Sequence, residues 1–306
     1  MPVATLISVS LTVSDITEAV AFYRDSLGLM VGAEQTLEDP AWTSLLGLKP
    51  GTRVRAADIV IGQQTIQLTE IDPPGKPYPP ERASNDQWFQ HVALVSGDIA
   101  AVWKGLALGS PGAITRGAPV TLPPSTGSVT AFKFRDPEGH PLELISFPPG
   151  VGDPQWQNKN HSGIIGYDHT AISVMDVARS IAFYTGLLGF KIGGRSLNTG
   201  IEQDRLDGLT DCEVDVVTLA SASLATLHVE LLHYRRPNGR TSNSEVRVTD
   251  VASTRQVHKV NNLDALVGQL ETESVTFVSP GMVTLRGGAK AVAIRDPDGH
   301  MITLME

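Results

Sequence analysis

The sequence predicts an α+β protein in which one plan, a strand followed by a helix and then three strands, occurs four times. Two observations predict this fold. Distant segments repeat at an almost constant offset, and each half opens with a two-residue hydrophobic period that changes to a helical one. Stretches rich in Pro, Gly, Ser and Asn separate the repeats, as expected of connectors.

The internal repeat rests on two unrelated motifs. Residues 7–32 and 168–193 align at an offset of 176 − 15 = 161. Residues 134–144 and 294–304, which contain the sequences RDPEGH and RDPDGH, align at 296 − 136 = 160. Two motifs at nearly one offset indicate two halves that share a plan.

Each half divides again, because the segment that starts at residue 91 is similar to the opening strand of each half and residues 257–270 are a weaker copy. We therefore expect two domains, at residues 1–150 and 151–306. Their four modules are expected at about 5–72, 88–148, 166–236 and 254–306.

The first module shows how the elements are predicted. Hydrophobic and small polar residues alternate along residues 7–13, the pattern of a half-buried strand with Ile7 on its apolar side. Asp15 follows as a helix N-cap, apolar residues then recur at helical spacing, and Gly28 ends the run. Further strands are expected at 57–61 and 65–69, and in the third module at 214–219 and 226–232.

Composition excludes several classes of protein. The 306 residues include 24 Lys and Arg and 33 Asp and Glu, so the net charge of −9 argues against a partner such as nucleic acid or an anionic membrane. Cys212 is the single cysteine, which excludes an intrachain disulfide and fits a reducing compartment. No apolar run approaches the roughly 18 residues of a membrane span. We expect a cytoplasmic protein.

The chain resembles the vicinal oxygen chelate superfamily in its four modules and in two motifs. The motif D-I/V…A-F-Y…L-G follows the first strand, and D-P-E/D-G-H precedes the last. That superfamily includes glyoxalase, methylmalonyl-coenzyme A epimerase, extradiol dioxygenases and bleomycin-resistance proteins. The resemblance spans nearly the whole chain and implies two cup-shaped mixed sheets, each closed by two modules around a divalent metal. It also implies that a module supplies one ligand from its first strand, usually His, and one from its last strand, usually Glu.

The resemblance assigns two positions to each module. Seven residues before the Asp or Asn that begins each helix stand Ser8, His91, His169 and Arg255. Seven residues after the Asp of each D-P-x-G-H motif stand Glu143 and Thr303, and the strand pattern alone gives Gln67 and Glu230.

The pairing of the modules decides which site is complete. Modules two and three together hold the metal-ligand candidates His91, Glu143, His169 and Glu230. Modules one and four hold Ser8, Gln67, Arg255 and Thr303, where the fixed cation would repel a metal. Pairing one with two, or three with four, leaves only two good ligands in each cup. The sequence thus predicts one metal site across the two halves, with donors that suit Fe, Mn, Ni, Zn or Co.

The resemblance implies a metal-dependent lyase or isomerase similar to glyoxalase, acting on a small-molecule substrate. The metal would bind two vicinal oxygens and stabilise a developing enediolate, while Glu143 or Glu230 moves a proton. One alternative is an Fe(II) extradiol-type dioxygenase, although Lys133 stands where those enzymes have a signature Tyr. The other is a non-catalytic binding protein of the antibiotic-resistance type.

Three further expectations concern the surroundings of the site. The polar segment 196–207 is expected to reach over the cup, with Asn198, Glu202, Gln203 and Arg205 as substrate contacts. His140 and His300, which recur in both halves, are expected to be turn residues. A monomer suffices because both cups form within one chain, and a homodimer is compatible with the sequence.

Overall fold

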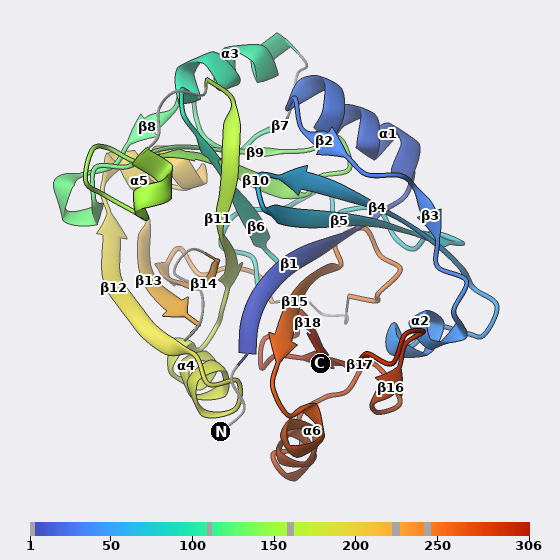
Figure 1. Ribbon diagram of the computed structural model, residues 1–306. Helices are drawn as coiled ribbons and strands as arrows, with labels where there is room; N and C mark the ends of the chain where they lie inside the picture. The colour runs from blue at the N-terminus through green and yellow to red at the C-terminus, as the bar shows by residue number, and fades with distance from the viewer. Residues whose placement is uncertain (1–3, 109–111, 158–161, 222–226, 242–245) are drawn as a thin grey trace.

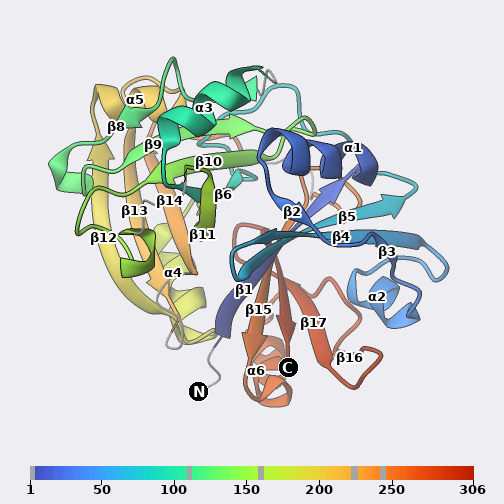
Figure 2. The ribbon, with the colours of Figure 1, turned by 45° about the horizontal axis from the view of Figure 1, so that its top comes forward.

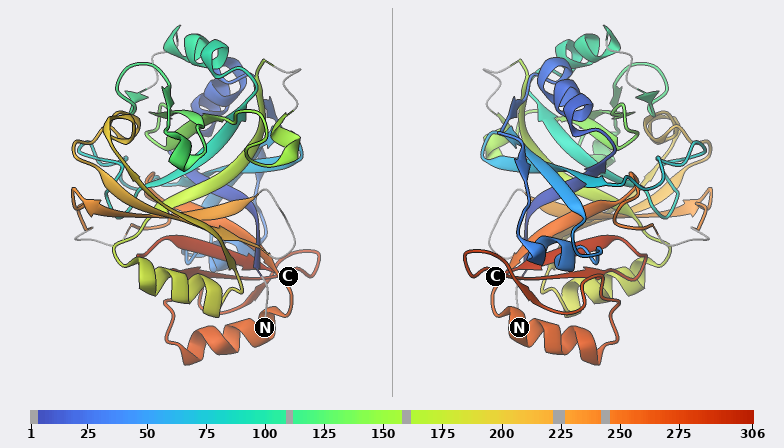
Figure 3. Two further views of the ribbon diagram at one scale, coloured as in Figure 1. Left: turned by 90° about the vertical axis from the view of Figure 1, so that its left-hand side faces the viewer. Right: turned by 90° about the vertical axis from the view of Figure 1, so that its right-hand side faces the viewer.

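The computed structural model describes residues 4–108, 112–157, 162–221, 227–241 and 246–306. Its strands form two nine-stranded sheets, which lie side by side in Figure 1. Helices α1 (Ile16–Ala21) and α3 (Ile99–Leu108) lie at one end of the molecule, and α4 (Val177–Gly186) and α6 (Leu263–Thr272) lie at the other (Figures 1 and 3). Among the described residues, no helix is both long and apolar enough to cross a membrane.

The first sheet joins the first and fourth modules. Its strand order is β16-β17-β18-β15-β1-β5-β4-β2, and β3 pairs with β4. The strands are β1 (Ala4–Val13), β2 (Met30–Val31), β3 (Gln35–Thr36), β4 (Arg53–Ile61), β5 (Gln64–Asp72), β15 (Thr254–Val260), β16 (Val283–Thr284), β17 (Lys290–Arg295) and β18 (Met301–Met305).

The second sheet joins the second and third modules in the order β12-β13-β14-β11-β6-β10-β9-β7, and β8 pairs with β9. The strands are β6 (Gln90–Ser96), β7 (Gly112–Ala113), β8 (Val120–Thr121), β9 (Thr130–Arg135), β10 (Pro141–Ser146), β11 (Ile164–Ser173), β12 (Lys191–Thr199), β13 (Glu213–Ala220) and β14 (His228–Arg236).

The observed order confirms the α+β fold with four β-α-β-β-β modules and two mixed sheets. In both sheets two opening strands meet antiparallel at the centre, β1 with β15 and β6 with β11. Each opening strand also pairs in parallel with the last strand of its own module. Each sheet therefore combines strands from both halves of the chain, while the division into domains at residue 150 stays a prediction.

The helices begin and end largely as the sequence predicts. The Asp15 carboxylate accepts hydrogen bonds from the backbone N–H groups of Thr17 and Glu18 and caps α1, and Asp176 caps α4. The first helix continues as a π-helical turn (Phe22–Ser26) before Gly28, whose φ of 67° suits a residue without a Cβ. Two short helices interrupt the plan at equivalent places, α2 (Pro40–Leu45) before β4 and α5 (Ile201–Asp207) before β13. Short 3-10 turns lie at Pro124–Thr126 and Pro154–Gln157.

One prediction for β1 is wrong. Ile7 was expected on the apolar side of the strand, but it is exposed because the pairing of β1 with β15 shifts register between Leu6 and Ser8. The later part of β1 is buried on both faces, Ser10 and Thr12 included. The apolar face belongs to a large core shared by both sheets and their helices. The opposite face lines a cavity.

The D-P-x-G-H turns connect the two sheets, which is more than the predicted turn role. Nε2 of the His140 imidazole lies 2.9 Å from the carbonyl oxygen of Thr12 and 2.9 Å from that of Val251. Nε2 of His300 lies 2.8 Å from the carbonyl oxygen of Ser173. Each motif therefore reaches from its own sheet to the opening strand of the other, and the two concave faces are held in a fixed relation.

Candidate metal centre

The second sheet brings the four predicted ligands onto four adjacent strands: Glu230 on β14, His169 on β11, His91 on β6 and Glu143 on β10. All four side chains line one cavity of about 710 Å³ on the concave face. We call this face, with its cavity, the β6/β11 cup. Side chains alternate between the two faces along each strand, so the apolar residues next to these four point to the opposite face and into the core.

The pairing register explains why the side chains meet. Ala93 on β6 pairs with both Glu143 and His169 on its two neighbouring strands. Residues paired across neighbouring strands lie on the same face of a sheet, and a β-carbon alone at Ala93 leaves space between the two side chains. Ala171 has the same place between His91 and Glu230. The two alanines therefore lie between the four candidate ligands in the sheet.

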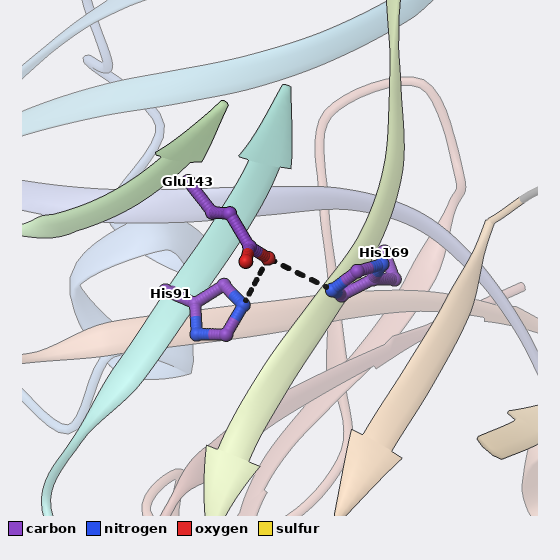
Figure 4. Close-up of side chains that lie close together, drawn as sticks. All are labelled: His91, Glu143 and His169. Atoms are coloured by element: carbon purple, nitrogen blue, oxygen red, sulfur yellow. Dashed lines mark hydrogen bonds and ion pairs between the residues drawn. The ribbon is translucent and has the colours of Figure 1, made fainter. Parts of the chain in front are cut away.

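Three of the four side chains form a compact group, shown in Figure 4. Nε2 of His91 lies 3.1 Å from Oε2 of Glu143, and Nε2 of His169 lies 3.5 Å from the same oxygen. One ligand atom from each residue lies within 4.8 Å of the others, and all three residues are buried. Two donors about 2.1 Å from an ion, at the angles of tetrahedral or octahedral coordination, are separated by roughly 3.0–3.4 Å. The observed spacing is close to that value.

Glu230 stands at the edge of this group. Its Oε2 lies 3.5 Å from Nε2 of His169, but its Oε1 lies 3.5 Å from Nε2 of His228 and accepts a hydrogen bond of 3.4 Å from the hydroxyl of Thr218. The side chain is 20% exposed, against 6% for Glu143. Glu230 therefore faces the open cavity, whereas Glu143 lies between the histidines.

Asp168 fixes the orientation of His169. Nδ1 of His169 lies 3.0 Å from Oδ2 of Asp168, and the indole N–H of Trp156 donates to Oδ1 of the same carboxylate at 2.7 Å. With Nδ1 directed at Asp168, Nε2 is the ring nitrogen that faces Glu143 and Glu230. A metal-binding histidine typically has such a carboxylate behind it.

The donor set fits a divalent cation. Within the described part of the chain, Nε2 of His169 is buried and makes no hydrogen bond, although two carboxylates lie beside it. A buried nitrogen without a partner is costly unless a ligand satisfies it. Two imidazoles and one or two carboxylates are donors that Fe, Mn, Ni, Zn and Co accept. The residues present therefore fit the metal that the sequence predicts.

The charges of the site also suit a cation. Burial raises the pKa of the Glu143 carboxyl, but the charge of His91 and the contacts with both histidines outweigh burial and hold that pKa well below its ordinary value. Burial likewise opposes ionisation of Glu230, yet His169 and His228 lower its pKa to about 2. Burial lowers the pKa of His91, with Glu143 offsetting part of the effect. Two ionised carboxylates thus face the same space.

Comparison with known proteins identifies the family. The family model described as the Glyoxalase/Bleomycin resistance protein/Dioxygenase superfamily matches residues 5–144 and 166–304. The chain belongs to this superfamily. No curated protein matches the sequence.

Two solved structures share the fold of this chain. Glyoxalase I from Zea mays is similar over 100% of this chain and 93% of its own, with 17% identity and a TM-score of 0.66. A putative dioxygenase from Bacillus subtilis is similar over 98% of this chain and 84% of its own, with 14% identity and a TM-score of 0.55. At this level of sequence identity the likeness shows the fold alone.

The expected substrate contacts divide into two pairs. Asn198 and Gln203 line the cavity and hydrogen-bond to each other at 3.2 Å. Glu202 and Arg205 are not among the lining residues, and the Arg205 guanidinium instead donates to backbone carbonyls of residues 116 and 118. Segment 196–207 does reach the cup, but its second half is the helix α5, so only one side of it faces inward.

Lys133 and Asp207 form a buried ion pair in the wall of the cup. Nζ of Lys133 lies 2.6 Å from Oδ1 of Asp207, whose other oxygen accepts from Gln203 at 2.7 Å and from the hydroxyl of Tyr234 at 3.1 Å. Lys133 also pairs directly with Glu143 across β9 and β10. This network fixes α5 at the mouth of the cavity.

The sequence reasoning missed Asp168 and the Lys133–Asp207 pair. Strict alternation places Asp168 on the face opposite His169, but a register shift between Tyr167 and His169 brings both side chains to the cavity. Lys133 could have been found, because it pairs with Glu143 in the hairpin that surrounds the D-P-x-G-H motif.

The strands of the first sheet pair in the same register as those of the second, but other residues stand at the equivalent positions. Val257 pairs with Ser8 and Thr303, as Ala93 pairs with His169 and Glu143. Ser10 pairs with Arg255 and Gln67, as Ala171 pairs with His91 and Glu230. The equivalences predicted from the sequence, including those of Gln67 and Glu230, therefore hold in the pairing of the strands. We call this concave face, with its cavity, the β1/β15 cup.

Proposed function

We propose that this chain is a divalent-metal-dependent enzyme of the lyase or isomerase type, acting on a small substrate with vicinal oxygens in the β6/β11 cup. One observation carries the proposal: His91, Glu143 and His169 converge on a shared point, and a further carboxylate, Glu230, faces the open cavity beside them. Chemistry that moves a proton needs a basic group beyond those that hold the metal.

His91, His169 and Glu143 would hold the metal, with Fe, Mn, Ni, Zn or Co suited to their donors. When bound, such an ion polarises a carbonyl oxygen and stabilises the negative charge that develops on it. Asp168 and Trp156 keep His169 in the required orientation. The apolar and polar walls of the cup leave room for a small molecule, since the cavity volume of 710 Å³ lies in the range of ordinary ligand sites.

Glu230 is the group that we assign to proton transfer. Its carboxylate would accept a proton from the carbon beside the substrate carbonyl, and the electron pair of that C–H bond would move toward the carbonyl oxygen. Glu230 would then give that proton to the former carbonyl carbon, while the hydroxyl proton of the first carbon passes to the former carbonyl oxygen. The first carbon becomes the new carbonyl, so the substrate is rearranged without any oxidant. Thr218 and His228 hold the outer oxygen of Glu230, which keeps Oε2 directed at the site.

Metal analysis and a substrate panel test the proposal. Protein purified without chelators is expected to contain about one divalent ion per chain, measured by inductively coupled plasma mass spectrometry. The panel consists of adducts of 2-oxoaldehydes with glutathione and other thiols, followed by absorbance and by exchange of substrate hydrogen in D₂O. Metal-free protein without affinity for any of the five metals would contradict the proposal, and so would activity that survives complete chelation.

An Fe(II) dioxygenase is the second candidate, favoured by the composition of the compact group. Two histidines and one carboxylate within 4.8 Å are the donor set of non-haem iron oxygenases, which leave coordination positions open for oxygen. Oxygen consumption by anaerobically iron-loaded protein in the presence of a catechol would favour this candidate. Its dependence on Glu230 would be weak, because the carboxylate outside the triad has no place in that reaction.

A further inference from the structure

The β1/β15 cup encloses a second cavity of about 210 Å³ that contains a buried arginine. Twelve residues of the described structure line it, and Arg255 is the one charged residue among these twelve. Helix α2 lies between the β3–β4 side and the β16–β17 side of this sheet (Figure 2) and supplies Trp42 and Leu45 to the wall.

The guanidinium of Arg255 is held by neutral hydroxyl groups. Nη1 donates to the hydroxyls of Thr12 at 2.6 Å and Ser253 at 3.4 Å, and Nη2 donates to the hydroxyl of Ser10 at 2.7 Å. These hydroxyls are themselves fixed, since Ser10 bonds to Thr69 and Thr12 donates to a backbone carbonyl. A guanidinium has five N–H groups, so these three hydrogen bonds leave two for a ligand.

In the described structure no acid compensates the charge of Arg255. Among the described residues, no carboxylate lies within ion-pair distance of Arg255, although only 3% of the residue is exposed. Burial alone lowers its pKa to about 10, with no opposing effect from a neighbouring carboxylate. In the other cup, by contrast, the buried Lys133 has Asp207 as its counterion. A buried cation without a counterion is unfavourable, and an anionic ligand removes that cost.

We infer that the β1/β15 cup binds a small organic monocarboxylate, with its carboxylate on the Arg255 guanidinium and its apolar body against α2. Planar guanidinium and carboxylate groups form paired hydrogen bonds, which a round anion does not match. Trp42, Leu45 and Met305 provide an apolar wall opposite the arginine. The volume is below that of ordinary drug-sized sites, so the ligand is compact. This site is independent of the metal and of the function proposed for the other cup.

Benzoate titration tests the inference on the full chain. Isothermal titration calorimetry is done after treatment with a chelator, so that the carboxylate has no metal to bind in the β6/β11 cup. Benzoate is expected to bind once per chain, and neutral benzamide at least tenfold more weakly. Equal binding of the two probes would overturn the inference, and so would inorganic phosphate binding more tightly than benzoate.

Variants locate the binding. Arg255→Met is expected to weaken benzoate binding at least tenfold, and Arg255→Lys less strongly because it keeps the charge without the planar fork. Val257→Phe fills the cavity while Arg255 stays, so it tests the site even if Arg255→Met fails to fold, and it is also expected to abolish binding. The matched control His169→Ala changes the other cup and should leave benzoate affinity within twofold. Benzoate binding that is lost in His169→Ala and kept in Val257→Phe would overturn the inference.

Discussion

The two concave faces of this molecule share a backbone and differ in what they hold. Both are formed by an opening strand from each half, paired antiparallel, with the last strand of a module on either side. At four equivalent places the β6/β11 cup has His169, His91, Glu143 and Glu230, and the β1/β15 cup has Ser8, Arg255, Thr303 and Gln67. One face gathers negative charge and imidazole nitrogens, whereas the other gathers hydroxyls around one cation.

The difference teaches that this fold fixes positions and leaves the chemistry to a few side chains. The residues between these positions also differ. Val257 stands at the place of Ala93 and Ser10 at the place of Ala171, and these larger side chains narrow the β1/β15 cup. The covering helices differ too: α5 brings Gln203 and Asp207 to a cavity of about 710 Å³, and α2 brings apolar residues to one of about 210 Å³. The comparison can be tested by changing equivalent residues in pairs.

The largest effect is expected from the first-strand pair His169 and Ser8. His169→Ala removes one of three compact donors, so metal affinity should fall by more than the roughly 10–100-fold that loss of a supporting residue costs. Ser8→Ala changes the equivalent place in the other sheet and should leave metal content unchanged. Mass spectrometric metal analysis measures both. Similar metal loss in the two variants would end the assignment of the metal to one cup.

The next effect concerns the last-strand pair Glu230 and Gln67. Glu230→Gln keeps the size of the side chain and removes its charge, so turnover should fall by about 10²–10⁴-fold while one metal per chain is retained. Gln67→Glu, its counterpart in the other sheet, should leave turnover unchanged. Steady-state kinetics with the adduct found in the panel gives both numbers. Full activity of Glu230→Gln would mean that another residue acts as the base, or it would favour the dioxygenase.

A smaller effect tests the support behind His169. Asp168→Asn weakens the contact to Nδ1, and metal affinity should fall roughly 10–100-fold with the fold intact. Trp156→Phe removes the donor to the other oxygen of Asp168 and should act in the same direction. The control Asp215→Asn changes a carboxylate that is paired with Arg235 outside the cup. Competition titration with a chromophoric chelator measures affinity, and equal values for Asp168→Asn and the control would contradict the role of Asp168.

The repeat allowed the fold to be predicted, and the resemblance to the superfamily supplied the main positions of the site. A fixed count of seven residues from a helix cap or from a D-P-x-G-H turn locates a strand residue well, because strands and caps leave little freedom in register. That count located His91, Glu143 and His169 on one face. Glu230 lacked the turn motif and was located by alternation along its strand, which holds because β14 is regular there.

What could not be predicted depends on departures from regular structure. The register shift beside His169 brings Asp168 to the cavity, and a similar shift exposes Ile7. Arg205 is expected as a substrate contact from the polarity of its segment, whereas in the structure Nε of Arg205 on α5 donates to the backbone carbonyl of residue 116. The hydroxyl cradle of Arg255 combines distant strands, and no single segment reveals it.

The last prediction concerns acid stability and a histidine on the core side of the first sheet. His258 on β15 is buried against Phe190, and burial lowers its pKa from 6.5 to about 3. Between these values the unfolded chain binds a proton that the folded chain does not, so stability falls as the pH drops below about 6.5. For these two pKa values, the loss between pH 7.5 and pH 5 is about 2 kcal/mol.

His258→Gln isolates that contribution, because the other histidines titrate equally in both proteins. Its free energy of unfolding from urea titrations should change by about 2 kcal/mol less than that of the wild type between the two pH values. Nε2 of His258 is paired with Oε1 of Gln256 at 2.9 Å. Nδ1 is buried without a partner in the described structure, so a proton bound to Nδ1 would find no hydrogen-bond acceptor. An unchanged difference in His258→Gln would contradict the lowered pKa of His258 in the folded protein.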